Sequence, residues 1–165
     1  MKKCNKDLLR VGKNTDMCIL GKKAIKNAKD TADLVETTKE FLMWQIKKNY
    51  PGEDILMKHF DGFKNEWCAV NVDGAEFRDQ RIVRIECGAK AIATYSSGKR
   101  GRLFVRHNST LTIKACRASY CVVSLYDNSK VKIEVDEGAK VYVFLHDTST
   151  IFDTHESKQI LIRKR

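Results

Sequence analysis

The chain has 165 residues, 42% hydrophobic and 32% charged, enough for one good-sized domain or for a small helical part plus a second fold. A single proline and the lack of low-complexity tracts argue against a disordered protein. Because no apolar run has the length of a membrane span or a signal peptide, we expect a protein that does not span a membrane and stays in the cell where it is made. The net charge of +10 favours an anionic partner, such as nucleic acid, a membrane surface or an acidic protein, although lysines spread over both halves are also typical of an ordinary solvated surface.

The N-terminal part of the chain predicts helices. Residues 1–14 look irregular and basic, and a short helix is expected from about residue 15 to about residue 28. The strongest helical pattern covers 32–49, where apolar residues recur at helical spacing. The proline that follows ends this helix, and a short helix with acidic residues in its first turn is expected over 51–60. A transition toward the second half begins at 67–70.

The second half of the chain repeats. Ser109, Ser129 and Ser149 are spaced by 20 residues and stand in similar frames. From about Val83 to Ile151, the apolar residues keep to odd-numbered positions without a change of phase. Strict alternation predicts strands, and a fixed repeat carried by strands predicts a solenoid whose stacked coils bury a common core.

Two kinds of corner predict a coil of about 20 residues rather than 10. The first kind places a polar pair before a serine, and it occurs at 107–109, 127–129 and 147–149. The second kind ends in a small residue after Gly or Ala, and we place in it 87–89, 117–119 and 137–139. We expect about four coils, which start near residues 81, 101, 121 and 141, and a last strand at 159–162.

The fold class that follows is α+β. A helical N-terminal segment over 1–66 precedes a single-chain parallel β-helix, or β-solenoid, over 67–165. The alternative is an antiparallel β-sandwich, whose strands also alternate, but hairpins rarely keep one phase over so many strands. Antiparallel hairpins between 101 and 151 would contradict the solenoid.

The even-numbered, outward residues distinguish two faces of the solenoid. One face is polar, with threonine and lysine side chains. The other face is apolar on its outer side as well, through Phe104, Val122, Tyr126, Tyr142 and Phe144. Because a strand that is apolar on both sides is normally covered, either the N-terminal helices or another chain should lie on this face. Cover by another chain would give a closed lateral oligomer, a dimer or a trimer.

A basic segment is a candidate anion site. Residues 98–101 are expected to interrupt the repeat and to replace one corner with a basic loop. The three cations Lys99, Arg100 and Arg102, next to glycines, could approach phosphate closely. The alternative is a mobile surface loop without a ligand.

Asp127 and Asp147 are the best candidates for acid–base chemistry. They would lie about one strand spacing, near 4.8 Å, apart and close to His146. The alternative is that both aspartates are corner residues of the Asx-turn type. Because the chain also lacks a phosphate loop and the GxSxG and HExxH motifs, we assign no catalytic residue.

The six cysteines are scattered, and none belongs to a CxxC pair. In a chain that stays inside the cell we expect structural thiols rather than disulfides, and we predict no metal site and no cofactor. Cys87 and Cys121 fall on the inward phase of the strands, which fits small core residues.

The repeat LYDNSKVKIEVDEGAKVYVFLHDTSTI resembles the short β-solenoid repeats of small proteins from bacteriophages and mobile elements of gut Bacteroidota, in which motifs such as DNSxVxV recur. Those proteins often carry a helical N-terminal segment that ends in a stretch similar to NYPGEDIL, followed by a tryptophan and a cysteine. Residues 49–56 and Trp67-Cys68 match that layout. The chain also resembles, more distantly, the pectin-lyase-like superfamily. The resemblance implies a solenoid and a phage context, and it carries over no functional residue.

We therefore expect a non-enzymatic structural or interaction protein, phage-encoded, that self-associates as a virion or assembly component. Its partners would be further copies of itself or other virion proteins, and its place the virion or the host cytoplasm. The alternative is an intracellular phage binder that inhibits a host defence protein or sequesters an anionic ligand. A polysaccharide-active enzyme, with a groove at Asp127, Asp147 and His146, is the third hypothesis.

Overall fold

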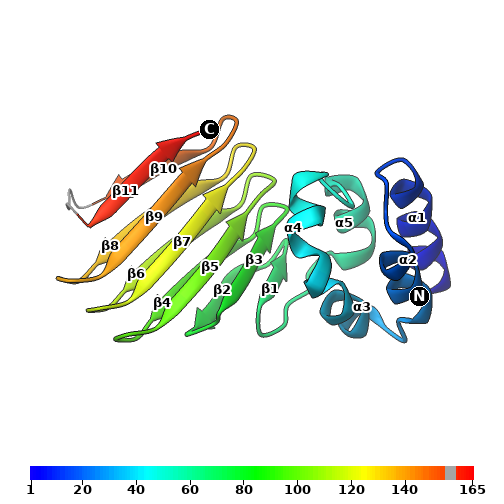
Figure 1. The fold of residues 1–165 in the computed structure, drawn as a ribbon, viewed down its shortest axis with the longest axis horizontal. Helices are drawn as coiled ribbons and strands as arrows, with labels where there is room; N and C mark the ends of the chain where they lie inside the picture. The colour runs from blue at the N-terminus through cyan, green and yellow to red at the C-terminus, as the bar shows by residue number, and fades with distance from the viewer. Residues whose placement is uncertain (155–158) are drawn as a thin grey trace. The chain divides into compact units, whose positions relative to one another are not determined.

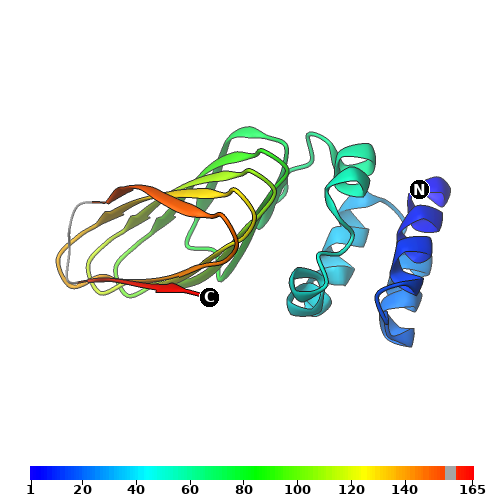
Figure 2. The same cartoon turned by 90° about the horizontal axis from the view of Figure 1, so that it is seen from above.

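A computed structural model describes residues 1–154 and 159–165 of the chain. It divides into two compact units, 1–60 and 61–165. The first unit is helical, and the second is a parallel β-solenoid of about five turns with roughly 20 residues per coil, which confirms the predicted α+β fold class. Figures 1 and 2 show the two units in two views.

The helical unit contains one helix that the sequence did not predict. Its elements are α1 (Lys2–Lys13), α2 (Ile19–Asn27), α3 (Thr31–Thr38), the 3-10 helix η1 (Lys39–Phe41), α4 (Leu42–Lys47) and α5 (Glu53–Phe60). The prediction of an irregular segment over 1–14 is wrong, because Cys4, Leu8 and Gly12 recur at helical spacing and form the buried stripe of α1. None of the helices in the described residues is long and apolar enough to cross a membrane.

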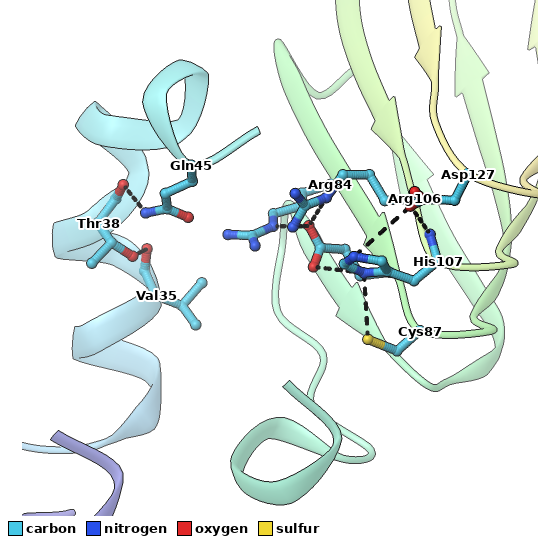
Figure 3. A network of polar contacts seen from close by, with 9 residues as sticks. Val35, Thr38, Gln45, Arg84, Cys87, Arg106, His107 and Asp127 are labelled. Atoms are coloured by element: carbon cyan, nitrogen blue, oxygen red, sulfur yellow. Dashed lines mark hydrogen bonds and ion pairs between the residues drawn. The ribbon is translucent and has the colours of Figure 1, made fainter. Parts of the chain in front are cut away.

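The long helix predicted over 32–49 is interrupted. It begins as predicted, with the side chain of Asp30 accepting from the backbone N–H of Asp33 at 2.8 Å. The hydroxyls of Thr37 and Thr38 then donate to backbone carbonyls four residues earlier, at 2.7 and 2.8 Å. Such back-bonding bends helices, and the chain passes through η1 before it continues as α4. Across the break, the Gln45 side chain donates to the Thr38 carbonyl at 3.0 Å (Figure 3).

The solenoid consists of two parallel sheets (Figure 1). Sheet A contains, in spatial order, β1 (Cys68–Val70), β3 (Ile82–Glu86), β5 (Arg100–Val105), β7 (Tyr120–Leu125), β9 (Lys140–Leu145) and β11 (Ile160–Lys164). Sheet B contains β2 (Asp73–Arg78), β4 (Lys90–Tyr95), β6 (Thr110–Ala115), β8 (Lys130–Val135) and β10 (Thr150–Thr154). From β3 to β9, each strand pairs with the strand 20 residues later, as in Leu111↔Val131 and Val123↔Val143.

The solenoid has about five turns rather than the four predicted. Its first turn comes from β1 and β2, in a stretch where we expected a transition. Cys68 pairs with Arg84 and Ala75 pairs with Ala91, so the offset is 16 residues instead of 20, and the register shifts within β2. This shorter first coil hides the repeat from a search for a fixed period.

The inward, odd-numbered residues form the core of the solenoid, as predicted. The side chains of Leu111, Ile113, Val123, Val131 and Val143 are at most 1% exposed. Full burial of a side chain of this size contributes about 1.5–3 kcal/mol. The stacked core is therefore the main source of stability for the coils.

Residues 98–101 do not interrupt the repeat, contrary to the prediction. Gly101 lies in β5 and pairs in register with Cys121, as the 20-residue frame requires. It faces inward, where a Cβ would overlap the ring of Tyr95. The glycine is needed because the large Tyr95 ring, 1% exposed, fills the space that a side chain at this position would occupy.

Candidate functional site

The outer side of sheet A carries a set of aromatic and apolar side chains that the parallel register aligns across the coils. We name it the aromatic face, and it consists of Phe104, Tyr120, Val122, Tyr126, Tyr142, Phe144 and His146. The register pairs Val122 with Tyr142 and places Phe144 two coils beyond Phe104. These residues occupy even positions, so their side chains project away from the core.

Ring contacts organise the aromatic face from one coil to the next. The rings of Tyr126 and His146 stack with centroids 4.3 Å apart and planes 8° apart, as the predicted frame requires. The ring centroids of Tyr120 and Tyr142 are 5.2 Å apart. The guanidinium of Arg165 lies 4.5 Å from the centroid of the Phe144 ring.

Most of the aromatic face is accessible. Tyr120 is 38% exposed, and Val122, Tyr126, Tyr142 and Phe144 are partly exposed. Phe104, in contrast, is 2% exposed, so its side chain cannot contribute a contact without a rearrangement. Partial burial, with the nearby charge of Arg165, lowers the pKa of His146, so its ring is neutral at pH 7 and adds to the apolar character of this face.

The outer side of sheet B is polar, as predicted. Its central strands present Thr110, Thr112, Lys114, Lys130, Lys132 and Glu134. The ammonium of Lys132 lies 3.4 Å from Glu134 and 3.1 Å from Asp153, while Lys114 lies 3.6 Å from Glu134. The two outer surfaces of the solenoid therefore differ in chemistry, and Ile92, 36% exposed, is a large apolar exception on sheet B.

The two aspartates of the suggested acid–base pair bind backbone N–H groups in neighbouring coils. A carboxylate oxygen of Asp127 accepts from the backbone N–H of His107 at 3.0 Å, and one of Asp147 accepts from the N–H of Asp127 at 3.3 Å. His107, Asp127 and Asp147 all have left-handed φ values, between 54° and 57°. These hydrogen bonds fit the alternative of corner residues, which tie one coil to the next.

A buried charged cluster lies where sheet A meets this column of corners, and it consists of Arg84, Glu86, Cys87, Arg106 and His107 (Figure 3). One carboxylate oxygen of Glu86 accepts from Nε of Arg84 and, at 2.9 Å, from Nε of Arg106. The other oxygen lies 3.7 Å from Nδ1 of His107, which in turn lies 3.8 Å from Sγ of Cys87. Nε2 of His107 lies 3.8 Å from the Asp127 carboxylate.

Electrostatics within the cluster keep Glu86 ionised. Burial by itself would raise the pKa of Glu86, which is fully buried, but the charges of Arg106 and Arg84 outweigh it and lower that pKa to about 2. Two guanidinium groups and one carboxylate leave a net charge of +1 on these three side chains. Such a network stabilises the fold only while all of its members are present.

The same cluster contains the set of side chains in the described residues that could hold a metal ion. Glu86, Cys87 and His107 offer oxygen, sulfur and nitrogen ligand atoms within 4.8 Å of one another, a donor set that suits zinc. The neighbouring Arg84 and Arg106 oppose this use, because a divalent cation would add to a site that is already positive and buried. We interpret the cluster as a structural ion-pair network.

Sequence reasoning missed this cluster because it placed the corner at 87–89 in the wrong column. The backbone N–H of Gly88 donates to the carbonyl of His107 at 2.8 Å, so this corner stacks against the one at 107–109, not the one at 117–119. The signal was present, since Glu86 and Arg106 carry opposite charges 20 residues apart. A charged pair at one coil spacing in the even phase is what a buried ladder of ion pairs requires.

The predicted anion-binding residues are not in a separate loop. Lys99 belongs to a regular corner, in which its backbone N–H donates to the Ser96 carbonyl at 3.1 Å. Arg100 and Arg102 are exposed residues of β5, paired with Tyr120 and Val122. These cations therefore border the aromatic face instead of forming a separate phosphate-binding loop.

Comparisons with protein-family models, with curated protein sequences and with solved structures found no match to this chain.

Proposed function

We propose that this chain is a non-enzymatic interaction protein whose solenoid presents the aromatic face to another protein surface, in the simplest case to the same face of a second copy. The observation that carries the proposal is the contrast between the two sheets. Sheet A exposes Tyr120, Tyr126, Tyr142 and Phe144 on a regular, rigid support, whereas sheet B exposes threonine, lysine and glutamate. Aromatic side chains are enriched in the buried centres of protein interfaces.

The dimensions of the face agree with an interface of modest size. A strand of six residues is about 20 Å long, and the strands from β3 to β11 span about 20 Å at about 4.8 Å per step. The resulting area of about 400 Å² is half of the roughly 800 Å² that each partner buries in a stable complex. The corners beside the sheet must therefore contribute, and we expect an association that depends on concentration.

The ends of the solenoid favour a closed assembly over a fibre. β11 is the last strand of sheet A and leaves one edge of backbone groups without a neighbouring strand. Arg163, Lys164 and Arg165 place three positive charges in and next to this strand, and charge on an edge discourages strand pairing. A lateral dimer or trimer, closed by rotation symmetry, is the expected form.

We further infer that the assembly belongs to a bacteriophage particle or to its construction. The resemblance of the repeat over 125–151 to phage-encoded solenoid proteins supports this part of the proposal. An infection-stage binder that blocks a host defence protein would use the same face for a different partner. Mass spectrometry of purified particles distinguishes the two, because absence of the chain from the virions would overturn a virion role.

Multi-angle light scattering on the purified chain tests self-association. We expect the wild type to be oligomeric at tens of micromolar, and Tyr142→Lys and Phe144→Lys to be folded monomers by circular dichroism. Ile92→Lys is the matched control, since it places the same charge on a partly exposed apolar position of sheet B and should leave the oligomer intact. A monomeric wild type, or equal dissociation by the control, would overturn the proposed interface.

A further inference from the structure

The N-terminal helices carry most of the positive charge of the chain. Residues 1–29 contain nine lysines and arginines against two aspartates, which gives +7 of the net charge of +10. The solenoid holds as many acids as cations apart from a small surplus, so this segment is a separate electrostatic feature. It lies in the helical unit, and a function assigned to it does not depend on the aromatic face.

Close packing of α1 and α2 places these cations on one surface. The two helices lie side by side (Figure 2) and pack around Met17, whose side chain fills the space that a Cβ at Gly12 would need. Leu8 of α1 and Ile25 of α2 are buried. The charged sides of both helices therefore remain outside, where they line a groove of about 950 Å³.

We name this hollow the basic groove. Its lining includes six lysines, namely Lys2, Lys3, Lys6, Lys13, Lys22 and Lys26. Within residues 1–154 and 159–165, none of these lysines forms an ion pair. Cations that no carboxylate neutralises are available to an external anion.

One carboxylate, that of Asp7, also lines the groove, but its charge is compensated from another helix. Lys58 of α5 donates to Asp7 at 2.7 Å, and Nε2 of His59 lies 2.9 Å from the same oxygen. These two hydrogen bonds lower the pKa of Asp7 to about 2, so it stays ionised and paired. Asp7 thus anchors α1 to α5 and does little to reduce the positive potential of the groove.

We propose that the basic groove binds the phosphate backbone of a nucleic-acid duplex. Lys2, Lys6, Arg10 and Lys13 follow one another at helical spacing along one side of α1, over about 18 Å. A duplex presents about ten phosphates over that length. Lys22 and Lys26, one turn apart on α2, supply a second row of cations.

The chemistry of the groove favours a duplex over other polyanions. No aromatic ring is among the residues described as lining it, so unpaired bases would find no surface on which to stack. Leu9 is its one apolar side chain, and its surface is hollow, whereas a helix that binds lipid inserts an apolar side into the bilayer. Lysine contacts to phosphates give affinity without reading base sequence.

Fluorescence anisotropy with a labelled random-sequence DNA duplex, measured on the full chain at several salt concentrations, tests the proposal. If about six phosphates are neutralised, the slope of log K against log salt is about −5, and affinity falls about 10³-fold between 50 and 200 mM salt. The variant Lys6→Gln/Lys22→Gln/Lys26→Gln should flatten that slope by about 3. The matching Lys→Arg variant, which keeps the charges, should retain the wild-type slope.

The control variant Lys99→Gln/Arg100→Gln/Arg102→Gln removes three exposed cations of the solenoid and should leave the slope unchanged. An equal loss in both triple variants would show a general effect of net charge and overturn the site. So would tighter binding to a single strand than to the duplex, or binding to vesicles with anionic lipid but not to DNA. Circular dichroism confirms that each variant is folded, since all the replaced side chains project to the surface.

Discussion

Replacing Glu86 by glutamine is the sharpest perturbation of the solenoid. The change keeps the size of the side chain but removes the charge that compensates Arg84 and Arg106, which are 5% and 2% exposed. Breaking a buried ion pair by removing one partner costs about 3–5 kcal/mol of unfolding free energy. Glu134→Gln is the matched control, because its partners Lys114 and Lys132 are partly exposed and the loss should stay below about 1 kcal/mol.

The same residue gives the solenoid a defined dependence on pH. The pKa of Glu86 is lowered from 4.5 to about 2, so the folded state favours the ionised carboxylate. The stabilisation is therefore complete above the unfolded pKa and is lost as the pH falls from about 4.5 to about 2. The difference corresponds to about 3 kcal/mol, of which about 2 kcal/mol is lost between pH 6 and pH 3.

Urea unfolding measures both effects. Trp67 is 3% exposed and belongs to the solenoid, so its fluorescence in a Trp44→Phe background reports this unit alone. The wild type should lose about 2 kcal/mol more than Glu86→Gln when the pH is lowered from 6 to 3. Equal losses in the two proteins, or a cost of Glu86→Gln below about 1 kcal/mol at pH 6, would refute the reasoning.

Further predictions concern the core and the corners, and urea unfolding checks each of them. Gly101→Val should cost about 1–3 kcal/mol by overpacking against Tyr95, and Tyr95→Leu in the same chain should recover part of the loss. Leu111→Ala, at a fully buried position, should cost about 2–5 kcal/mol. Asp127→Asn should cost only a few tenths of a kcal/mol, because asparagine tolerates a φ of 57° and keeps an acceptor for the N–H of His107, whereas Asp127→Ala should cost about 1–2 kcal/mol.

The sequence predicted the fold best where each coil repeats the one before it. From β3 to β9 the register is constant, so a period of 20 residues and an alternation in odd phase identify the strands and the core residues together. The first coil escaped because its offset of 16 residues, as from Ala75 to Ala91, breaks the period. Basic composition concealed α1, although Cys4 and Leu8 are spaced as helix neighbours.

The candidate sites were predicted less completely, since they depend on contacts between residues that pattern alone does not place. The aromatic face follows from phase, yet the burial of Phe104 does not. The buried charged cluster required the right column for Cys87, and the two corner types differ too little in sequence to give it. The basic groove depends on the packing of α1 against α2 at Gly12, in a segment where the sequence predicted no helix.

Photo-crosslinking tests the central claim, that the aromatic face is an interaction surface for a second copy, most directly. Benzoylphenylalanine in place of Tyr142 should yield a crosslinked dimer at micromolar concentrations of the purified chain. The same probe in place of Ile92, on sheet B, should leave the chain monomeric on a denaturing gel. Equal crosslinking at the two positions, or none at position 142 while the wild type is oligomeric, would contradict the claim.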